Sequence, residues 1–475
     1  MSFLSREATV ARPGFNRWLV PPAAVAVHMC IGQVYAFSVF NKPLGAELGV
    51  PVSKVNAAYM IALVMLGLSA AFFGKWVERS GPRKAMLAAC GCFCGGLLLT
   101  ALGVKLESLA LILGGYGFVG GIGLGLGYIA PVSTLVKWFP DRPGMATGMA
   151  IMGFGGGALI GSPLAQELMK SFAAGGYSAL GIASASVDQK LLHLLVKPLA
   201  APLNALASGT TSGAMQTLIT MAVIYACFIL FGAFIVRVPA PDWKPEGYEP
   251  KTAAARGMIT TASVSVDDAW KTPQFWLLWT VLCMNVSAAI GVLGRAADMC
   301  QDMFGVSAAI GAGFAGLLSI FNMGGRFLWS SVSDFTGRKT VYCIYFILGA
   351  VLYAVLPHAQ ETQNRALFVL CTAVIISMYG GGFSTIPAYL KDLFGTHHVG
   401  AIHGRLITAW SMAAVIGPSL INGFYDSRVA AGMPKAHAYN GTFYLMCGLL
   451  AVGLVANLLV RPVDPKHHLK QSPAA

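Results

Sequence analysis

An arginine lies inside a long apolar stretch of the sequence, between positions 307 and 332. Arg326 has Asn322 one helical turn before it, and Ser330 and Asp334 continue the same polar face at helical spacing. An arginine near the centre of a membrane costs about 2.5 to 3.5 kcal/mol on insertion scales, so such residues usually face a cavity and serve transport. A guanidinium also offers two parallel donors to the two oxygens of a carboxylate. We therefore predict that Arg326 binds an anion; the alternative is a structural arginine bonded to nearby carbonyls.

Two histidines and a second arginine are the other ionisable residues of interest. His28 shares a helical face with Tyr35 in the first apolar run, and His403 shares one with Trp410 in a later run. A histidine in a membrane is either a satisfied polar contact or a proton-binding group, and both interpretations remain open for this pair. Arg295 lies near the end of its apolar run, where its side chain can reach the interface, so we expect an entrance residue and not a central ligand. No Asp or Glu lies in the core of a run, so we expect no carboxylate proton relay.

The composition is that of a polytopic membrane protein. Of the 475 residues, 56% are hydrophobic and only 11% are charged, whereas a soluble domain has about 25% charged residues. The net charge of +13 does not indicate a nucleic-acid partner, because the basic residues are spread over short loops between apolar runs. Most of the ten cysteines lie inside apolar runs and match no zinc-binding pattern. We expect a monomer in a lipid bilayer, without a metal or other cofactor.

Twelve apolar runs are long enough to span a bilayer. They cover approximately residues 17–40, 55–77, 84–104, 108–137, 143–170, 214–237, 273–296, 307–332, 340–357, 365–390, 399–424 and 438–460. With the N terminus inside, the inner segments hold roughly twice as many lysines and arginines as the outer ones, which predicts that both termini are cytoplasmic. We expect the cell inner membrane as the location.

The chain repeats its own loop motif. GKWVERSGPRK at 74–84 corresponds to SSVSDFTGRK at 330–339, which aligns Glu78 with Asp334 at an offset of 256 residues. Parallel repeats of six helices place the substrate near the bilayer midplane, between the halves. The predicted organisation is a first half at 1–237 with an outer-loop insert at 171–213, a cytoplasmic linker at 238–271, and a second half at 272–475.

Several of these motifs resemble those of a known family. The paired loop motifs resemble the signature of the major facilitator superfamily after its helices 2 and 8. Within it, IGQVYAFSVF, GLGYIAPVSTLVKWFP, FNMGGRFLWSSVSDFTGRK and HGRLITAWSMAAVIGPSL are similar to the oxalate/formate antiporter family, which overlaps monocarboxylate transporters. The similarity spans nearly the whole chain apart from 171–213 and the tails. It implies an all-α membrane protein of twelve transmembrane helices in two pseudo-symmetric halves, which moves small carboxylates by alternating access.

The resemblance also implies roles for individual residues. The family's substrate-binding arginine of helix 8 falls on Arg326, and the assisting residue one turn earlier falls on Asn322. The aromatic residues that line the family's cavity fall on Tyr35, Tyr128 and Tyr379. The helix 11 lysine of the oxalate exchanger is replaced here by Trp410, so the second cation is absent.

These observations lead to a ranked set of functions. A single central cation and an apolar Trp410 surface favour a monocarboxylate of the lactate, pyruvate or formate type, moved by exchange or proton symport, because a dianion would carry one uncompensated charge. The alternative is an oxalate or other dicarboxylate/formate antiporter, and a more distant one is a carboxylate receptor without transport. The sequence contains no nucleophile with its base, no metal cluster and no phosphate-binding loop, so we do not expect an enzyme.

Charged residues in the repeated loop motifs predict a gate. Glu78 and Arg79 in the first half, with Asp334 and Arg338 in the second, can form ion pairs across the cytoplasmic ends. We expect these pairs to close only when the protein faces outward.

Overall fold

The computed structural model describes residues 3–173, 202–206, 211–241, 243–248, 258–260 and 262–469. In this part of the chain the secondary structure is helical, and extended pairing is confined to two isolated bridges, Val10 with Val238 and Val264 with His468. Both bridges join the segment around the predicted linker to a chain terminus.

The first half of the chain forms one bundle of long helices. Its elements are α1 (Val20–Gly32), η3 (Gln33–Ala36), α2 (Ser38–Glu47), α3 (Val52–Ser80), α4 (Pro82–Lys105), α5 (Leu109–Ile112), the π-helical segment η4 (Leu113–Gly120), α6 (Gly121–Trp138), α7 (Pro143–Ala173) and α9 (Ala214–Ile235). The segments α5, η4 and α6 together make one continuous helical span, Leu109–Trp138.

The second half forms a corresponding bundle. After the short α10 (Val266–Ala269), its elements are α11 (Pro273–Phe304), α12 (Ala308–Thr336), α13 (Arg338–Glu361), α14 (Arg365–Phe394), α15 (Val399–Leu406), α16 (Thr408–Ala430), α17 (Lys435–Ala438) and α18 (Asn440–Leu459). Eleven spans of the described chain are long and apolar enough to cross a membrane. The 29-residue α12 packs between α14 and α7 and covers the remaining predicted run, 307–332.

In each half, a glycine at the equivalent position follows the second long helix. Gly81 follows α3 with φ +83°, and Gly337 follows α12 with φ +91°. Side chains with a Cβ rarely adopt such angles, so glycine allows the chain to turn sharply into the next helix. The two glycines are separated by the same 256 residues as Glu78 and Asp334, as two repeated halves require.

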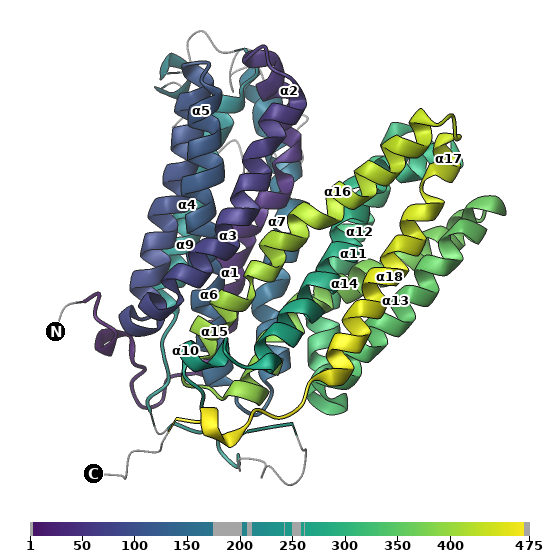
Figure 1. The fold of residues 1–475 in the computed structure, drawn as a ribbon. Coiled ribbons are helices and arrows are strands. Elements are labelled where there is room, and N and C mark those ends of the chain that lie inside the picture. The colour runs from purple at the N-terminus through teal and green to yellow at the C-terminus, as the bar shows by residue number, and fades with distance from the viewer. Residues whose placement is uncertain are drawn as a thin grey trace.

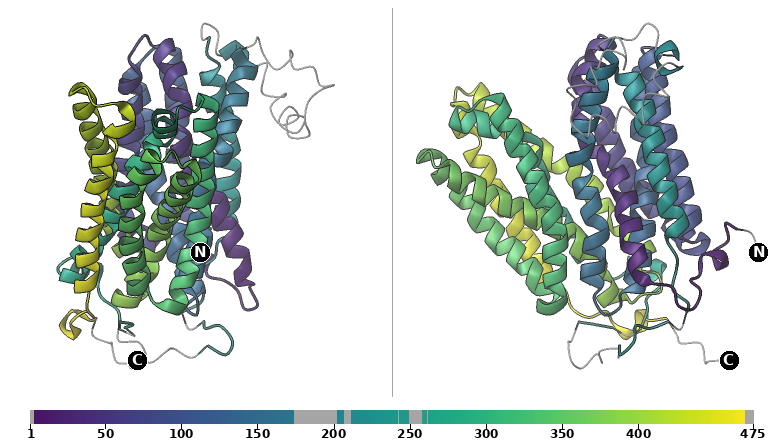
Figure 2. Two further views of the ribbon diagram at one scale, coloured as in Figure 1. Left: turned by 90° about the vertical axis from the view of Figure 1, so that its right-hand side faces the viewer. Right: turned by 180° about the vertical axis from the view of Figure 1, so that it is seen from behind.

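The two bundles meet at one end of the molecule. Figure 1 shows them close together near the termini and diverging toward the opposite end, where α2 and α17 lie apart, and the view from behind in Figure 2 agrees. Across the boundary, α12 and α14 pack against α7, while α15 and α16 pack against α3. The all-α fold of two six-helix halves is therefore confirmed.

Glycine lets α1 and α7 approach closely. A Cβ added at Gly157 of α7 would lie 2.6 Å from the carbonyl oxygen of Met29 and would also clash with the backbone of Gly32, both on α1. This close approach brings His28 of α1 and Tyr35 of η3 to the boundary with the second bundle.

Part of the predicted organisation lies outside the described residues. Of the predicted insert at 171–213, residues 174–201 and 207–210 are not described. At its far end, the backbone amides of Thr211 and Ser212 donate to the carboxylate of Glu47 at 2.8 and 2.9 Å. The half boundaries and the linker remain predictions.

Candidate functional site

Arg326 lies at the boundary between the two bundles. Its side chain is fully buried, its Nε donates to Oδ1 of Asn322 at 3.2 Å, and its Nη1 donates to the carbonyl of Ile151 on α7 at 3.4 Å. Nη2 is equally buried, and no described residue accepts a hydrogen bond from it. Buried polar groups in proteins are nearly always bonded, so this donor is available for a ligand.

The neighbouring elements are shaped around this guanidinium. A Cβ on Gly155 of α7 would lie 2.8 Å from Nε of Arg326, and one on Gly380 of α14 would lie 3.1 Å from its Cγ. The rings of Phe154 and Phe383 have their centroids 5.8 and 5.2 Å from Cζ of Arg326, within the range of cation–π attraction. Each pair has one residue from either half, so both halves build the site.

Aromatic side chains extend the site away from the arginine. The Trp410 ring lies 4.6 Å from Phe383, 5.3 Å from Phe154 and 5.9 Å from Tyr128 between centroids. The hydroxyls of Tyr35 and Tyr379 are 3.2 Å apart and form a hydrogen bond between the halves. The structure thus brings together the residues that the sequence predicts to bind substrate: Arg326, Asn322, Tyr35, Tyr128, Tyr379 and Trp410.

Several polar atoms of this cluster have no partner. Three buried atoms form no hydrogen bond with a described residue: Oη of Tyr128, Nε1 of Trp410 and Nε2 of His403. The rings that carry them are in contact, because Tyr128 lies 5.8 Å from His403 and 5.9 Å from Trp410. Together with Nη2 of Arg326, the Tyr128 hydroxyl and the Trp410 indole nitrogen offer hydrogen-bond donors beside one positive charge, and the described cluster contains no carboxylate. Such a set suits a small organic anion.

The two histidines occupy different positions. His28 of α1 is fully buried, with Nδ1 3.0 Å from the carbonyl oxygen of Ala24 and Nε2 3.2 Å from the carbonyl oxygen of Tyr128. Its ring meets the Tyr128 ring edge-on at 5.4 Å. The ring of His403 on α15 lies 5.8 Å from the same Tyr128 ring, so both histidines lie beside the aromatic cluster.

Arg295 lies apart from this cluster. Its Nε donates to Oδ1 of Asn422 at 2.7 Å, its Nη2 is 3.6 Å from the Asp426 carboxylate, and its Cζ stacks 4.4 Å from the Tyr425 ring. All three partners belong to α16 of the same half. The ion pair compensates its charge, and the entrance role stays a prediction.

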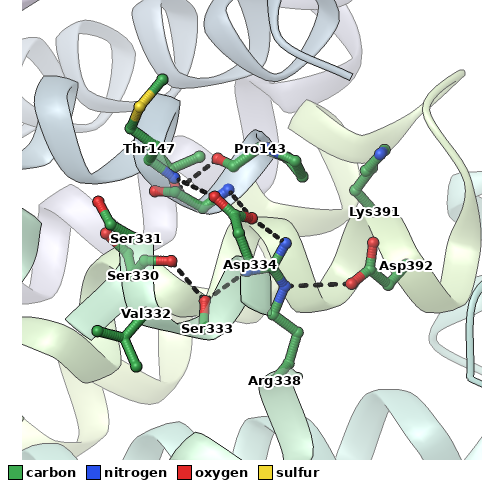
Figure 3. Close-up of polar contacts among 12 residues, drawn as sticks. Pro143, Thr147, Ser330, Ser331, Val332, Ser333, Asp334, Arg338, Lys391 and Asp392 are labelled. Atoms are coloured by element: carbon green, nitrogen blue, oxygen red, sulfur yellow. Dashed lines mark hydrogen bonds and ion pairs between the residues drawn. The ribbon is translucent and has the colours of Figure 1, made fainter. Parts of the chain in front are cut away.

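Asp334 connects the halves at the end that holds the termini. Its carboxylate accepts hydrogen bonds from the backbone amides of Gly144 at 2.9 Å and Met145 at 2.8 Å, at the beginning of α7. Arg338 donates to Asp334 at 2.6 Å and to Asp392 at 3.1 Å, and Figure 3 shows this network beneath the end of α7. A carboxylate at a helix N-terminus is stabilised by the exposed amides and the helix dipole.

Glu78 makes the matching contact in the other direction. It accepts from the backbone amide of Gly400 at 3.1 Å, at the beginning of α15, and pairs with Lys137 at 2.6 Å. Gly144 and Gly400 are again separated by 256 residues. We call the two contacts, Asp334 with the α7 amides and Glu78 with the Gly400 amide, the carboxylate latches.

One detail of the predicted gate is wrong. Glu78 and Arg79 are predicted to join Asp334 and Arg338 in ion pairs across the halves, but Arg79 is exposed and forms no ion pair in the described chain. Helix N-termini take the place of the expected cations because the glycines at positions 144 and 400 allow a carboxylate to reach bare backbone amides. Sequence patterns do not show that tertiary contact.

The linker adds a third connection between the halves. Asp267 of α10 pairs with Lys75 of α3 at 2.6 Å and with Arg405 of α15 at 2.8 Å. The two cations lower the pKa of Asp267 to about 2. Because the pKa is depressed, the bridge is present above the ordinary pKa of an aspartate and is lost only as pH falls toward 2. It therefore stays charged at physiological pH.

The candidate site and the boundary between the halves also contain residues that the sequence does not predict. Phe154 and Phe383 face the guanidinium, and the hydroxyl of Thr147 donates to the carbonyl of Ser384 in the other half at 2.6 Å. A signal for Phe154 does exist, because it is the one bulky residue in the glycine-rich run Gly153–Gly157. Phe383 stands in a similar run after three glycines.

A family model matches most of the chain. The model, described as Major Facilitator Superfamily, matches residues 23–418 and 323–475. Among solved structures, the crystal structure of the E. coli fucose:proton symporter FucP is similar, with a TM-score of 0.60 at 14% identity over 93% of this chain and 99% of that one. At such low identity the likeness shows the fold alone.

Three curated proteins are similar over most of their lengths. YhjX, an uncharacterised MFS-type transporter of Escherichia coli K12, is 25% identical over 401 residues, 84% of this chain and 86% of that protein. The oxalate:formate antiporter of Oxalobacter formigenes is 25% identical over 414 residues, 85% and 84% of the two chains. Apicoplast pyruvate carrier 1 of Toxoplasma gondii is 27% identical over 483 residues, 84% and 82% of the two chains.

Proposed function

The chain belongs to the Major Facilitator Superfamily, and we propose that it is a secondary transporter that moves small monocarboxylates by alternating access. The observation that carries the proposal is Nη2 of Arg326, a charged donor buried without a described partner between the two halves. A carboxylate oxygen supplies the missing acceptor and also compensates the charge. The similarity to an oxalate:formate antiporter and a pyruvate carrier supports a carboxylate as the substrate.

The charge of the site favours a single carboxylate. Arg326 is the one cation in the described part of the cluster, because Arg295 is paired with Asp426 of its own half. A second carboxylate group would meet the rings of Trp410, Phe154 and Phe383. Burying an unpaired charge costs several kcal/mol. Formate, lactate and pyruvate satisfy the site, whereas oxalate leaves one charge unpaired.

The contacts at the boundary suggest how access alternates. The carboxylate latches and the Asp267 bridge hold the halves together at the end with the termini, while the bundles diverge at the other end (Figure 1). With both termini in the cytoplasm of a cell with an inner membrane, as the basic loops indicate, this conformation faces outward. Transport then requires the latches to open and the far ends to close. One monomer suffices, because both halves of one chain form the site.

Exchange in proteoliposomes tests this proposal. The full-length protein is reconstituted with unlabelled formate, lactate or pyruvate inside, and uptake of the same labelled acid is measured with unlabelled acids as competitors. We expect monocarboxylates to exchange and to compete more strongly than oxalate. Failure of every monocarboxylate to exchange refutes the proposal, and stronger competition by oxalate favours the dicarboxylate/formate alternative.

A further inference from the structure

The surroundings of His28 contain only acceptors. Its two ring nitrogens lie 3.0 and 3.2 Å from the backbone carbonyl oxygens of Ala24 and Tyr128. A neutral imidazole carries one N–H, so it can donate to only one of these carbonyls, and its other nitrogen faces an oxygen lone pair with a lone pair of its own. A protonated ring donates to both. Whichever tautomer the neutral ring adopts, an acceptor is therefore already in place for an added proton.

We propose that His28 is the proton-binding site of this transporter and that its proton is carried together with the substrate carboxylate. The inference rests on the proposed function and extends it from the substrate to the coupling ion. The ring is fully buried at the boundary of the halves, and it touches the Tyr128 ring whose hydroxyl belongs to the substrate site. Only the side chain of Tyr128 therefore separates a proton on His28 from the proposed anion site.

The charges around His28 couple the two ligands. The groups that act on it are Arg326 of α12, His403 of α15 and the ring of Tyr128 on α6. The helices α7 and α9 pack against α1, yet α9 carries no charged residue and α7 carries none before Glu167. In the empty site, Arg326 and a protonated His28 repel each other. A bound carboxylate removes that repulsion, so anion and proton bind cooperatively.

His403 is less suited to this role. Its Nε2 is buried without an acceptor among the described residues, so nothing in the described structure favours a proton on that nitrogen. One anion with one proton on His28 adds no net charge to the site. The predicted mode is thus electroneutral symport of one proton with one monocarboxylate, which also permits exchange when the proton stays bound.

Proton uptake on substrate binding tests the assignment without requiring turnover. Purified full-length protein in weakly buffered detergent solution is titrated with lactate between pH 6 and 8, and both lactate binding and the pH change are recorded. The variants are H28Q, whose amide can still donate to the carbonyls but does not titrate, and H437Q, which changes an exposed histidine of α17. We expect the wild type and H437Q to take up about one proton per lactate bound.

The H28Q variant should bind lactate without taking up a proton, and its affinity should no longer fall as pH rises, whereas the wild type should weaken by up to about tenfold per pH unit. Proton uptake by H28Q equal to that of the wild type overturns the assignment, as does a folded H28Q that binds no lactate at any pH. Failure of the wild type to bind any monocarboxylate refutes the proposed function instead.

Discussion

At the scale of single residues, the guanidinium of Arg326 defines the site. Arg326 is held by Asn322 and by the carbonyl of Ile151, while its third nitrogen has no described partner. Because these contacts already fix the guanidinium in place, less conformational entropy is lost when a carboxylate binds to it. The aromatic rings around the guanidinium keep water away and strengthen its interaction with a carboxylate.

The substitution R326K tests whether the paired donors of the guanidinium bind the carboxylate. Lysine keeps the charge but loses the planar pair of donors, and a hydrogen bond to a charged group contributes about 1.5 to 3 kcal/mol, so exchange should fall about tenfold or more. The measurement is the initial rate of labelled lactate exchange in proteoliposomes with equal amounts of inserted protein. R79K, at an exposed arginine of α3, serves as the matched control. Exchange by R326K at the wild-type rate would rule out bidentate binding.

Trp410 is expected to set the preference for one carboxylate. W410K places a second cation beside the site and should raise the affinity for oxalate about tenfold while weakening lactate exchange. The measurement is the oxalate concentration that halves labelled lactate uptake. W410F keeps an uncharged ring and should retain the preference of the wild type. If the two variants shift oxalate competition equally, the effect is one of size and not of charge.

At the scale of elements, glycines decide how closely helices approach. The α1–α7 contact depends on Gly157, which lies against Met29 and Gly32. This contact holds His28 and Tyr35 of the first half against the site. A helix displaced here would misplace both residues together.

G157A should therefore destabilise the protein. Its Cβ has no room against α1, and overpacking costs about 1 to 3 kcal/mol, more than the gain of about 1 kcal/mol in helix propensity. We expect a lower midpoint of thermal unfolding in detergent and slower lactate exchange. The control G448A adds a Cβ in α18 where no atom lies within 4 Å. It should be neutral or slightly stabilising, and a G157A midpoint at or above that of G448A would contradict the packing argument.

The sequence predicts the helices well because the length of an apolar run and the residues of a turn can be recognised from neighbouring positions in the chain. Arg326 and Asn322 are recognised from spacing along one helix, and the repeated loop motif shows the two halves. The π-helical segment at Leu113–Gly120 has no such local signal. The expected ion pair of Arg79 also fails, because the partner of Glu78 is a helix N-terminus that only the tertiary fold brings near.

At the scale of the whole molecule, two equivalent latches hold one end closed. Glu78 of the first half caps α15 of the second, and Asp334 of the second half caps α7 of the first. A carboxylate at a partly buried helix N-terminus contributes about 0.3 to 2 kcal/mol. Because two-state populations respond exponentially to such energies, removing both charges should change which end is open.

The double variant E78Q/D334N tests this balance. The amides keep the size of the carboxylates but lose the charge, and a loss of one or two kcal/mol changes a population ratio by about 5- to 30-fold. Spin labels at K84C and T336C, both exposed near the closed end on opposite halves, report the separation in a C227S background. We expect a longer-distance population to grow in the double variant. E167Q, which breaks an exposed ion pair within α7 near its opposite end, should leave the distances unchanged. A distribution in E78Q/D334N identical to that in E167Q would show that the remaining contacts between the halves, and not the latch charges, set the closed conformation.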